Sequence, residues 1–437
     1  MKERASLLII ITSLVAFLIV FQKYFNTMWA IIFLIGFMSL YSIYMWIATK
    51  YRKRKERKNP PIVNYNFHPL VTIMIPAHNE ETVIEKTVEN ILKIDYDSFE
   101  IILIDDRSDD NTAKIIKNLE EKHKNITALI REKTATAGKS AVLNDAMKLA
   151  KGEAILVFDA DAKVEADFLN KMIPKLEPAD VGAVQAQKVI INAKQNFLTQ
   201  CQYNEYILDT HMQVGRDAVR GAVELRGCGE LIKRQALISI DGWNEETIVD
   251  DLDMSTRLHI KGWDIRFCPD AKVYEEGVIT FGALIKQRRR WVEGSIRRYL
   301  EYAGQVFNSK DMSLRVGFDL IAYISEFLLP FWLIAEICIQ GYHYIKGDAN
   351  GILSSAIIVG TTAIFFICGF IYSLRKYANM KFPQTFIQAI VTSIYFLTIW
   401  FPIAMFIIFK IVFTKKTMDW GKTVHGVATV SINEDIK

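Results

Sequence analysis

Two long apolar stretches at the start of the chain constrain its fold more than any other feature of the sequence. Residues 5–21 and 27–49 are almost free of charge, and each is close to the length that crosses roughly 30 Å of hydrocarbon as a helix. Lys2 and Arg4 would suit a signal peptide, but no small-residue cleavage site separates the two stretches, which favours a retained helical hairpin. The next segment, KYRKRKERK at 50–58, carries seven Lys or Arg residues. By the positive-inside rule it places the N-terminus and the following domain in the cytoplasm.

A segment of ordinary soluble composition separates this hairpin from further apolar stretches near the C-terminus. Its length of about 250 residues is enough for one well-buried domain. We therefore expect a multi-pass protein of the cell membrane whose soluble domain is cytoplasmic. The expected parts are a hairpin with its basic linker at 1–58, a cytosolic domain at 59–310, membrane helices at 311–414 and a tail at 415–437.

The sequence leaves the number of C-terminal membrane spans open. Apolar stretches lie at 317–342, 352–374 and 385–413, and three spans would put Lys415 and Lys416 on the outer side, against the charge bias. The first stretch is the least convincing simple span, and re-entry or packing against the cytosolic domain would explain its composition. It contains Asp319, Glu326, Pro330 and Glu336.

Composition excludes several classes of protein. The formal net charge is only +4 and 51% of the residues are hydrophobic, so the chain does not have the overall charge of a nucleic-acid-coating protein. The five cysteines show no C-x-x-C spacing, which argues against a zinc site or a disulfide scaffold and suits a reducing cytosol. The basic runs flank apolar stretches and no recognition module accompanies them, so we expect no nucleic-acid partner.

The middle of the chain alternates between strand and helix patterns. Four short β-branched runs are predicted strands, and Asn79 is placed to cap the helix after the first of them. This alternation predicts an α/β, Rossmann-like domain with a mostly parallel sheet, whose ligands bind at the carboxyl ends of the strands. The predicted strands are 71–76, 100–106, 127–132 and 154–160, and helices follow the first three, the second of them near 111–122.

Two phosphate-binding motifs fail on inspection, and a third pattern is weak alone. AGKS at 137–140 lacks the earlier P-loop glycine, because Lys133 stands there, and GCGELI has Ile232 where a dinucleotide fingerprint has its third glycine. Asp159 and Asp161 form Asp-x-Asp at a strand end, where carboxylates suit Mg²⁺ or Mn²⁺. Such a triplet arises about once by chance in a chain of this length. Its position at a strand end favours function.

The ordered set of motifs is far more specific than any of its parts. Along residues 70–300 the chain carries VTIMIPAHNEE, IILIDDRSDDNT, GKSAVLNDAM, VFDADAKV, RGCGELIKRQAL, DGWNEETIVDDLDMSTRL and QRRRW. This set resembles the family 2 glycosyltransferases, which are inverting enzymes with a GT-A fold. With its flanking apolar stretches, the chain is most similar to their membrane-embedded branch, which includes cellulose, chitin, hyaluronan and poly-N-acetylglucosamine synthases.

The resemblance implies a role for individual residues. It assigns Asp251 as the general base, with VDDLD in place of the family's common T-E-D, and Asp161 as the more direct metal ligand beside Asp159. It also implies that Ala77, Glu80 and Asp106 line a uridine pocket with Asp105 beside it, and that Lys139 approaches the phosphates. The remaining implied contacts with the nucleotide sugar come from Q-x-x-R-W, at Gln287, Arg290 and Trp291.

Chemistry supports these assignments independently. Breaking a nucleotide–sugar bond requires the leaving diphosphate to be stabilised, which a divalent ion with Lys and Arg achieves electrostatically. An acceptor hydroxyl needs a positioned base, and a carboxylate in a partly dry site suits that role. Within the arginine-rich segment 284–302, we expect Arg290 to meet the diphosphate and Trp291 to form a wall for the acceptor. For Arg297 and Arg298, lipid phosphates and the domain's own carboxylates stay equally open.

The acceptor divides the remaining interpretations. Q-x-x-R-W is often linked with processive synthases, which favours a growing glycan. The stretches from IVDDLDMSTRL to RRYLEY, and DWGKTVHG near the end, look more like the β-monoglucosyldiacylglycerol synthases, which implies UDP-glucose as donor and a membrane lipid as acceptor. We favour the lipid acceptor. A nucleotide-sugar sensor without turnover is disfavoured, because the base, the metal motif and Q-x-x-R-W are all present.

Overall fold

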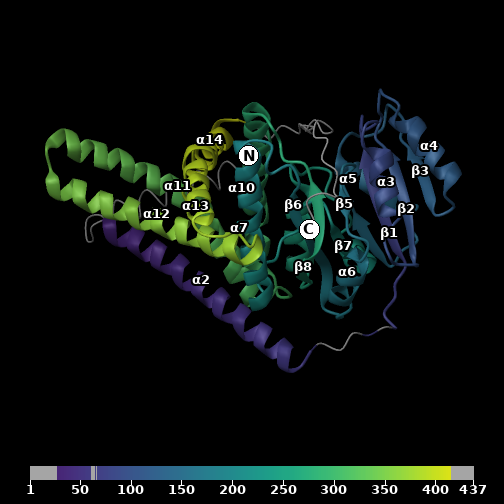
Figure 1. Cartoon of the computed structure of the whole chain (residues 1–437), viewed down its shortest axis with the longest axis horizontal. Coiled ribbons are helices and arrows are strands. Elements are labelled where there is room, and N and C mark those ends of the chain that lie inside the picture. The colour runs from purple at the N-terminus through teal and green to yellow at the C-terminus, as the bar shows by residue number, and fades with distance from the viewer. Residues whose placement is uncertain (1–26, 61–63, 65, 415–437) are drawn as a thin grey trace.

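The computed structural model describes residues 27–60, 64 and 66–414. An eight-stranded sheet and its covering helices form one side of the described chain, and long helices project from the other side (Figure 1). The apolar stretch at 5–21 and the tail at 415–437, with its DWGKTVHG segment, lie outside the described residues.

The first half of the sheet is parallel, in the strand order β3-β2-β1-β4. All four strands predicted from the sequence are present, within a few residues of the expected bounds. Ala77, at the end of β1, lies opposite Asp105, at the end of β2, so the two carboxyl ends share one edge of the sheet. The bounds are β1 Val71–Ala77, β2 Phe99–Asp105, β3 Ile126–Ile130 and β4 Ala154–Val157.

The second half is mixed, although four of the seven strand pairings in the whole sheet are parallel. The prediction of a mostly parallel sheet is therefore confirmed in part. β7 (Glu230–Lys233) runs antiparallel to both β4 and β6 (Val181–Ile190). β8 (Asp264–Glu275) is parallel to β6, and the two-residue β5 (Lys163–Val164) is antiparallel to β8. The strand–helix alternation behind the prediction ends near residue 160, and β6 leads instead into the 23-residue helix α7 (Phe197–Val219) before the chain returns through β7.

Helices cover both faces of the sheet. Successive side chains of a strand point to opposite faces, so Ile73 and Ile75 join one buried cluster while Met74 joins the other. The first cluster includes residues from α3 (Ile84–Ile91), α4 (Thr112–Lys122) and α6 (Phe168–Leu176). The second includes residues from α5 (Lys139–Met147), α8 (Arg234–Ser239) and α9 (Asp250–Ile260).

The expected helix cap at Asn79 is wrong. α3 begins five residues later, at Ile84, and the residue before it, Val83, makes no side-chain cap hydrogen bond. Asn79 has a left-handed backbone with φ 55°, and its Oδ1 accepts a hydrogen bond from the backbone N–H of Asp109 at 2.7 Å. Asn tolerates this conformation better than most residues. Its side chain therefore joins the loop after β1 to the loop after β2.

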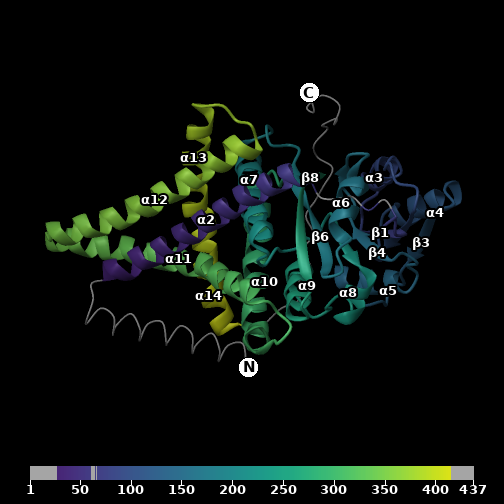
Figure 2. The ribbon, with the colours of Figure 1, turned by 90° about the horizontal axis from the view of Figure 1, so that it is seen from below.

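The remaining helices pack beside the sheet domain and extend away from it (Figure 2). α10 (Phe281–Asn308) lies against α14 (Phe401–Phe413), and Leu284, Val292 and Ile407 share a buried cluster there. The other helices beside the sheet domain are α2 (Thr27–Lys58), α11 (Leu314–Lys346), α12 (Ala349–Tyr377) and α13 (Gln384–Tyr395). A π-helical turn, Phe396–Trp400, connects α13 to α14.

These helices occupy the predicted apolar stretches, but they differ in the length of their apolar part. Among the described residues, one helical run, Gln384–Phe413, is long and apolar enough to cross a membrane. Spans at the other stretches stay a prediction. Asp319 of α11 is buried, with its Oδ1 2.6 Å from the Tyr41 hydroxyl and its Oδ2 3.5 Å from Arg216 Nε. It is thus part of a structural ion pair, which explains a charge within this stretch.

Candidate active site

Two buried aspartates, Asp105 and Asp106, lie at and directly after the end of β2, beside the end of β1. The backbone N–H of Asp106 donates to Ala77 O at 2.8 Å, and its buried carboxylate accepts from Arg131 at 2.6 Å and Arg107 at 2.9 Å. Asp105 Oδ2 accepts from the Ser108 N–H, whereas its buried Oδ1 has no hydrogen-bond partner among the described residues. A buried carboxylate oxygen in this state is suited to accept an N–H from a ligand.

Glu80 lies in the loop between β1 and α3, close to the same edge. Its backbone N–H donates to Thr112 Oγ1 at 2.8 Å, which ties this loop to the start of α4. The structure thus brings Glu80, Ala77, Asp105 and Asp106 to one side of the sheet edge, where parallel strands commonly bind ligands.

Lys139 is the first residue of α5 and reaches the end of β4. Its Nζ lies 2.6 Å from Asp159 Oδ1 and 2.7 Å from the carbonyl oxygen of Gly227. Burial alone would lower the pKa of Lys139, but Asp159, Asp250 and Glu230 surround it and hold the pKa above its usual range. Lys139 is therefore a fixed cation, and it lies at a helix N-terminus, a position that favours anions.

Asp251 approaches the same place from the first turn of α9. A Cβ added to Gly227 would lie 3.2 Å from Asp251 Oδ2 and 3.8 Å from Lys139 Nζ, so the three residues are neighbours. Gly227 also has φ +77°, which L side chains rarely adopt. Burial, followed by repulsion from Asp250, raises the pKa of Asp251 to about 6. A carboxylate with this pKa is a stronger base than an ordinary aspartate and is still ionised at neutral pH.

Glu230 was not identified from the sequence, although it faces this cluster. It begins β7 opposite Val157 of β4, is fully buried, and neither carboxylate oxygen has a hydrogen-bond partner among the described residues. Burial, and then repulsion from Asp250, Asp251 and Asp159, raises the pKa of Glu230 to about 8, although Lys139 opposes the shift. The signal in the sequence was an acidic residue at the start of a short apolar strand, directly after Gly227-Cys-Gly229. From the sequence alone, this segment, GCGELI, is interpreted only as an incomplete dinucleotide-binding motif.

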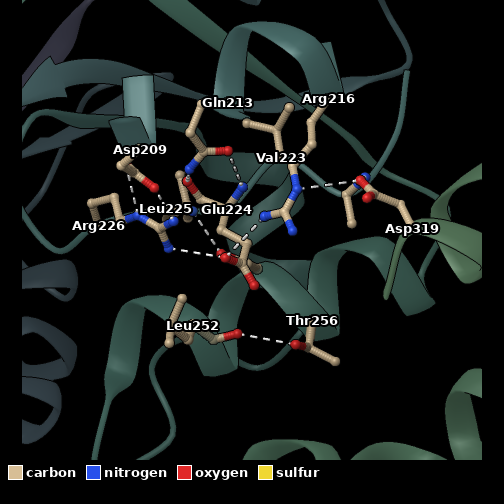
Figure 3. Close-up of polar contacts among 12 residues, drawn as sticks. Asp209, Gln213, Arg216, Val223, Glu224, Leu225, Arg226, Leu252, Thr256 and Asp319 are labelled. Atoms are coloured by element: carbon tan, nitrogen blue, oxygen red, sulfur yellow. Dashed lines mark hydrogen bonds and ion pairs between the residues drawn. The ribbon is translucent and has the colours of Figure 1, made fainter. Parts of the chain in front are cut away.

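A buried ionic cluster holds the loop that carries Gly227. We call Glu224, Arg216, Arg226 and Arg298 the Glu224 cluster. Figure 3 shows Arg216 and Arg226 approaching Glu224 from two sides, backed by Asp319 and Asp209 respectively. Burial would raise the pKa of Glu224, but the three arginines hold it well below its usual range. Sequence reasoning missed this cluster, because its members come from separate segments.

The Q-x-x-R-W helix α10 lies on the side of the domain that faces the apolar helices. Trp291 stacks on the guanidinium of buried Arg288, at 4.3 Å from the ring centroid, and Arg288 pairs with Glu205 at 2.9 Å and approaches Gln287 Oε1. Among the described residues, no hydrogen bond or ion pair joins Gln287, Arg290 or Trp291 to the carboxylates around Lys139. Their role toward a nucleotide sugar stays a prediction.

The two arginines left open by the sequence meet protein carboxylates. Arg297 pairs with Glu293 at 3.0 Å, and Arg298 pairs with Glu224 at 2.8 Å. Both arginine side chains are at most 3% exposed, so neither reaches lipid phosphates. The arginine-rich segment is therefore largely an internal ionic element of the domain.

The donor set around β4 fits a divalent cation that is shared with a substrate. Across the described residues, no three His, Cys, Asp or Glu side chains form a metal site from protein ligands alone. Mg²⁺ is usually held by one or two carboxylates plus substrate phosphates, which requires no such trio. Asp159 is 40% exposed beside Lys139, and Asp161 follows two residues later, so this strand end carries two carboxylates of the kind that such a cation binds.

A comparison with known protein families identifies the class to which this fold and site belong. Residues 68–294 match the family described as Glycosyltransferase like family 2, which covers more than half of the chain. The chain therefore belongs to the family 2 glycosyltransferases, and its mixed sheet is a GT-A-like fold. The family resemblance inferred from the sequence is confirmed.

Individual relatives and one solved structure are similar to this chain over most or part of its length. The chain is 35% identical over 406 residues to the beta-monoglucosyldiacylglycerol synthase of Trichormus variabilis, covering 91% of this chain and 84% of the relative. It is 31% identical over 264 residues to the poly-beta-1,6-N-acetyl-D-glucosamine synthase of Staphylococcus aureus, covering 59% and 63%. The mannosyltransferase PcManGT of Pyrobaculum calidifontis, solved with GDP-Man and Mn²⁺, superposes with a TM-score of 0.58 at 21% identity, covering 84% of this chain and 97% of that one. At that identity the match shows the fold alone.

Proposed function

We propose that this glycosyltransferase moves a hexose from a UDP-sugar, UDP-glucose in particular, to a membrane lipid such as diacylglycerol, with inversion at the anomeric carbon. The observation that carries the chemical step is the meeting of Lys139, Asp159 and Asp251 around Gly227. The lipid acceptor is supported by the 35% identity to a beta-monoglucosyldiacylglycerol synthase over 91% of the chain.

The donor is expected to lie along the carboxyl edge of β1, β2 and β4. Asp105 Oδ1, buried without a hydrogen-bond partner among the described residues, suits the imide N–H of uracil, with Ala77, Glu80 and Asp106 around the base. Lys139 suits the diphosphate, because it is a buried cation at the N-terminus of α5. Gln287, Arg290 and Trp291 complete the proposed donor and acceptor contacts from α10.

The chemical step then requires stabilisation of the diphosphate and activation of the acceptor. Lys139 would stabilise the negative charge that develops as the sugar–phosphate bond breaks. Mg²⁺ or Mn²⁺ held by Asp159 and Asp161 would add positive charge at the same diphosphate. Asp251 would take the proton of the acceptor hydroxyl, which attacks the anomeric carbon from the face opposite the diphosphate, so the configuration inverts.

Membrane placement completes this proposal. Gln384–Phe413 is long and apolar enough to span a bilayer, and the basic end of α2 favours a cytoplasmic position for the catalytic domain. We propose a multi-pass protein in which α10 lies near the membrane surface, where a lipid acceptor would be presented to the active site.

A second candidate is a processive polysaccharide synthase with a growing glycan as acceptor. It is favoured by Q-x-x-R-W and by the 31% identity to the poly-beta-1,6-N-acetyl-D-glucosamine synthase. The shorter coverage of that relative, 59% of this chain against 91%, makes it the weaker candidate.

A product assay separates the candidates. Purified full-length protein receives radiolabelled UDP-glucose or UDP-N-acetylglucosamine with Mg²⁺, with and without diacylglycerol, and products are separated by lipid chromatography and gel. A discrete glycolipid formed only with diacylglycerol is the expected result. High-molecular-mass label formed without added lipid would identify the polysaccharide synthase instead.

A matched pair of variants tests the chemical assignment. Asp251→Asn should lose roughly 10²- to 10⁴-fold in rate while retaining UDP binding, whereas the same change at exposed Asp270 of β8 should leave the rate unchanged. An Asp251→Asn variant with unchanged turnover would remove Asp251 as the base.

A further inference from the structure

A pocket of about 1060 Å³ lies between α2 and α12, outside the segments that carry the catalytic motifs. The two helices run side by side (Figures 1 and 2), and α7 packs against both of them. None of the residues that line the pocket belongs to the candidate active site.

The α2 wall of this pocket is a stripe of positive charge. Lys50, Lys53, Arg54 and Arg57 line the pocket, and their spacing of three, four and seven residues puts them on one face of the helix. Arg52 lies on a different face and is already paired, with Glu56 and with the side chain of Asp217 in α7. The helix therefore uses one arginine for docking and directs four other cations into the pocket.

The α12 wall changes from apolar to charged within two turns. Cys368, Ile371 and Tyr372 line one part, and Arg375 and Lys376 follow one turn later. Lys50 on α2 and Arg375 on α12 each come directly after an apolar stretch, at 27–49 and 352–374. Both helices thus pass from apolar to basic at this pocket, as expected where hydrocarbon gives way to headgroups.

The positive charge of the pocket is not neutralised by protein. Among the described residues, none of the six Lys and Arg side chains in its walls forms an ion pair with a carboxylate. Lys376 instead lies over the rings of Tyr372 and Tyr377, and Lys50 lies over Trp46. Burial, and then repulsion from Lys53 and Lys50, lowers the pKa of Lys376 to about 8. Such crowding of like charges is relieved by a bound anion.

We propose that this pocket binds the headgroup of an anionic phospholipid, with its phosphate between the α2 stripe and Arg375 and Lys376. The apolar part of the α12 wall would contact the first carbons of the acyl chains. Cations near a membrane surface attract anionic lipids, and a pocket that collects six of them selects one lipid over the bulk. This site rests on the proposed membrane placement but not on the donor or acceptor, so its failure and that of the proposed reaction are distinguishable.

Two pairs of substitutions on one helix end test the site. Lys53→Gln with Arg57→Gln removes two charges from the pocket, and Lys55→Gln with Lys58→Gln removes two from other faces of α2. All four side chains are exposed, so both variants should fold. Arg375→Gln tests the opposite wall. Full-length protein in zwitterionic nanodiscs is titrated with phosphatidylglycerol, and retained lipid is counted by native mass spectrometry. Parallel arms use phosphatidylcholine alone and soluble inorganic pyrophosphate.

The expected result is one tightly retained phosphatidylglycerol per chain. Affinity should fall roughly 10- to 30-fold in the pocket pair, about fivefold in Arg375→Gln and less than about twofold in the control pair. Equal losses in the two α2 pairs would mean diffuse surface attraction and would overturn the site. Retention of phosphatidylcholine to the same extent, or competition by pyrophosphate without any lipid retention, would also overturn it.

Discussion

Removing the charge of Glu224 should destabilise the catalytic domain more than any nearby substitution of similar size. Glu224→Gln keeps the shape of the side chain and removes the one carboxylate shared by three arginines, of which Arg216 and Arg298 are buried. Arg226 would retain Asp209 at 2.6 Å, and Arg216 would retain Asp319 at 3.5 Å. Arg298 would be left with the carbonyl oxygen of Leu252, at 3.3 Å.

The magnitude follows from that stranded cation. Breaking a buried ion pair by removing one partner costs about 3–5 kcal/mol, because the other charge stays buried without compensation. For a domain of this size, that is a decrease of roughly 6–20 °C in midpoint temperature. Asp209→Asn is the matched control. Its side chain is 37% exposed, and such a pair contributes about 1 kcal/mol or less.

The assay is thermal unfolding of the detergent-purified protein, followed by intrinsic fluorescence and by the fraction that remains monodisperse after heating. Adding Arg298→Met to Glu224→Gln should recover a large part of the loss, because the uncompensated cation is then absent. Equal midpoints for Glu224→Gln and Asp209→Asn, or no recovery in the double variant, would refute the reasoning.

Four further outcomes are expected. With a pKa of Asp251 at about 6, kcat/KM should fall about tenfold per pH unit below pH 6, as the base form is lost, and a flat profile to pH 5 would contradict this. Lys139→Met should weaken UDP binding by calorimetry, because Asp159 then faces the diphosphate without its cation. Glu230→Gln should preserve folding and activity at pH 7, since a pKa of about 8 already keeps this carboxyl protonated, and should remove any rate change near pH 8. EDTA should abolish turnover, which Mg²⁺ or Mn²⁺ should restore; full activity in EDTA would exclude the Asp159–Asp161 metal assignment.

The first half of the fold was predictable because its signals are local. β1 to β4 are short apolar runs that end in polar loops, and periodicity alone locates them within a few residues. The direction of β7 is set by its pairing with β4 and β6 instead, which no local pattern in ELIK encodes. The same limit explains the failed cap at Asn79, whose side chain bonds a loop 30 residues away.

The candidate site likewise contains residues that local sequence patterns identify and residues that they do not. Asp105, Asp159 and Asp251 lie at strand ends or a helix start, where polar residues are visible against an apolar run, and the structure puts them at one edge. Glu230 and Glu224 acquire their meaning only from burial and from partners distant in the chain. Charge and sequence position do not distinguish such residues from solvated carboxylates.

The Glu224 cluster also explains why the helices beside the domain matter for the active site. Asp319 of α11 pairs with Arg216, Arg216 with Glu224, and Glu224 with Arg226, the residue directly before Gly227. The carbonyl oxygen of Gly227 in turn accepts a hydrogen bond from Lys139 Nζ, and Gly227 lies beside Asp251. Arg298 of α10 binds the same carboxylate, so two helices outside the sheet hold the loop between the cation and the base. A Cβ added at Gly221 would lie 2.4 Å from Asp319 Oδ2, so a glycine at this position allows α11 to pack close to the loop. The contacts thus form a continuous series from α11 to Lys139 and Asp251, so we expect a shift of α11 to change the geometry around Asp251.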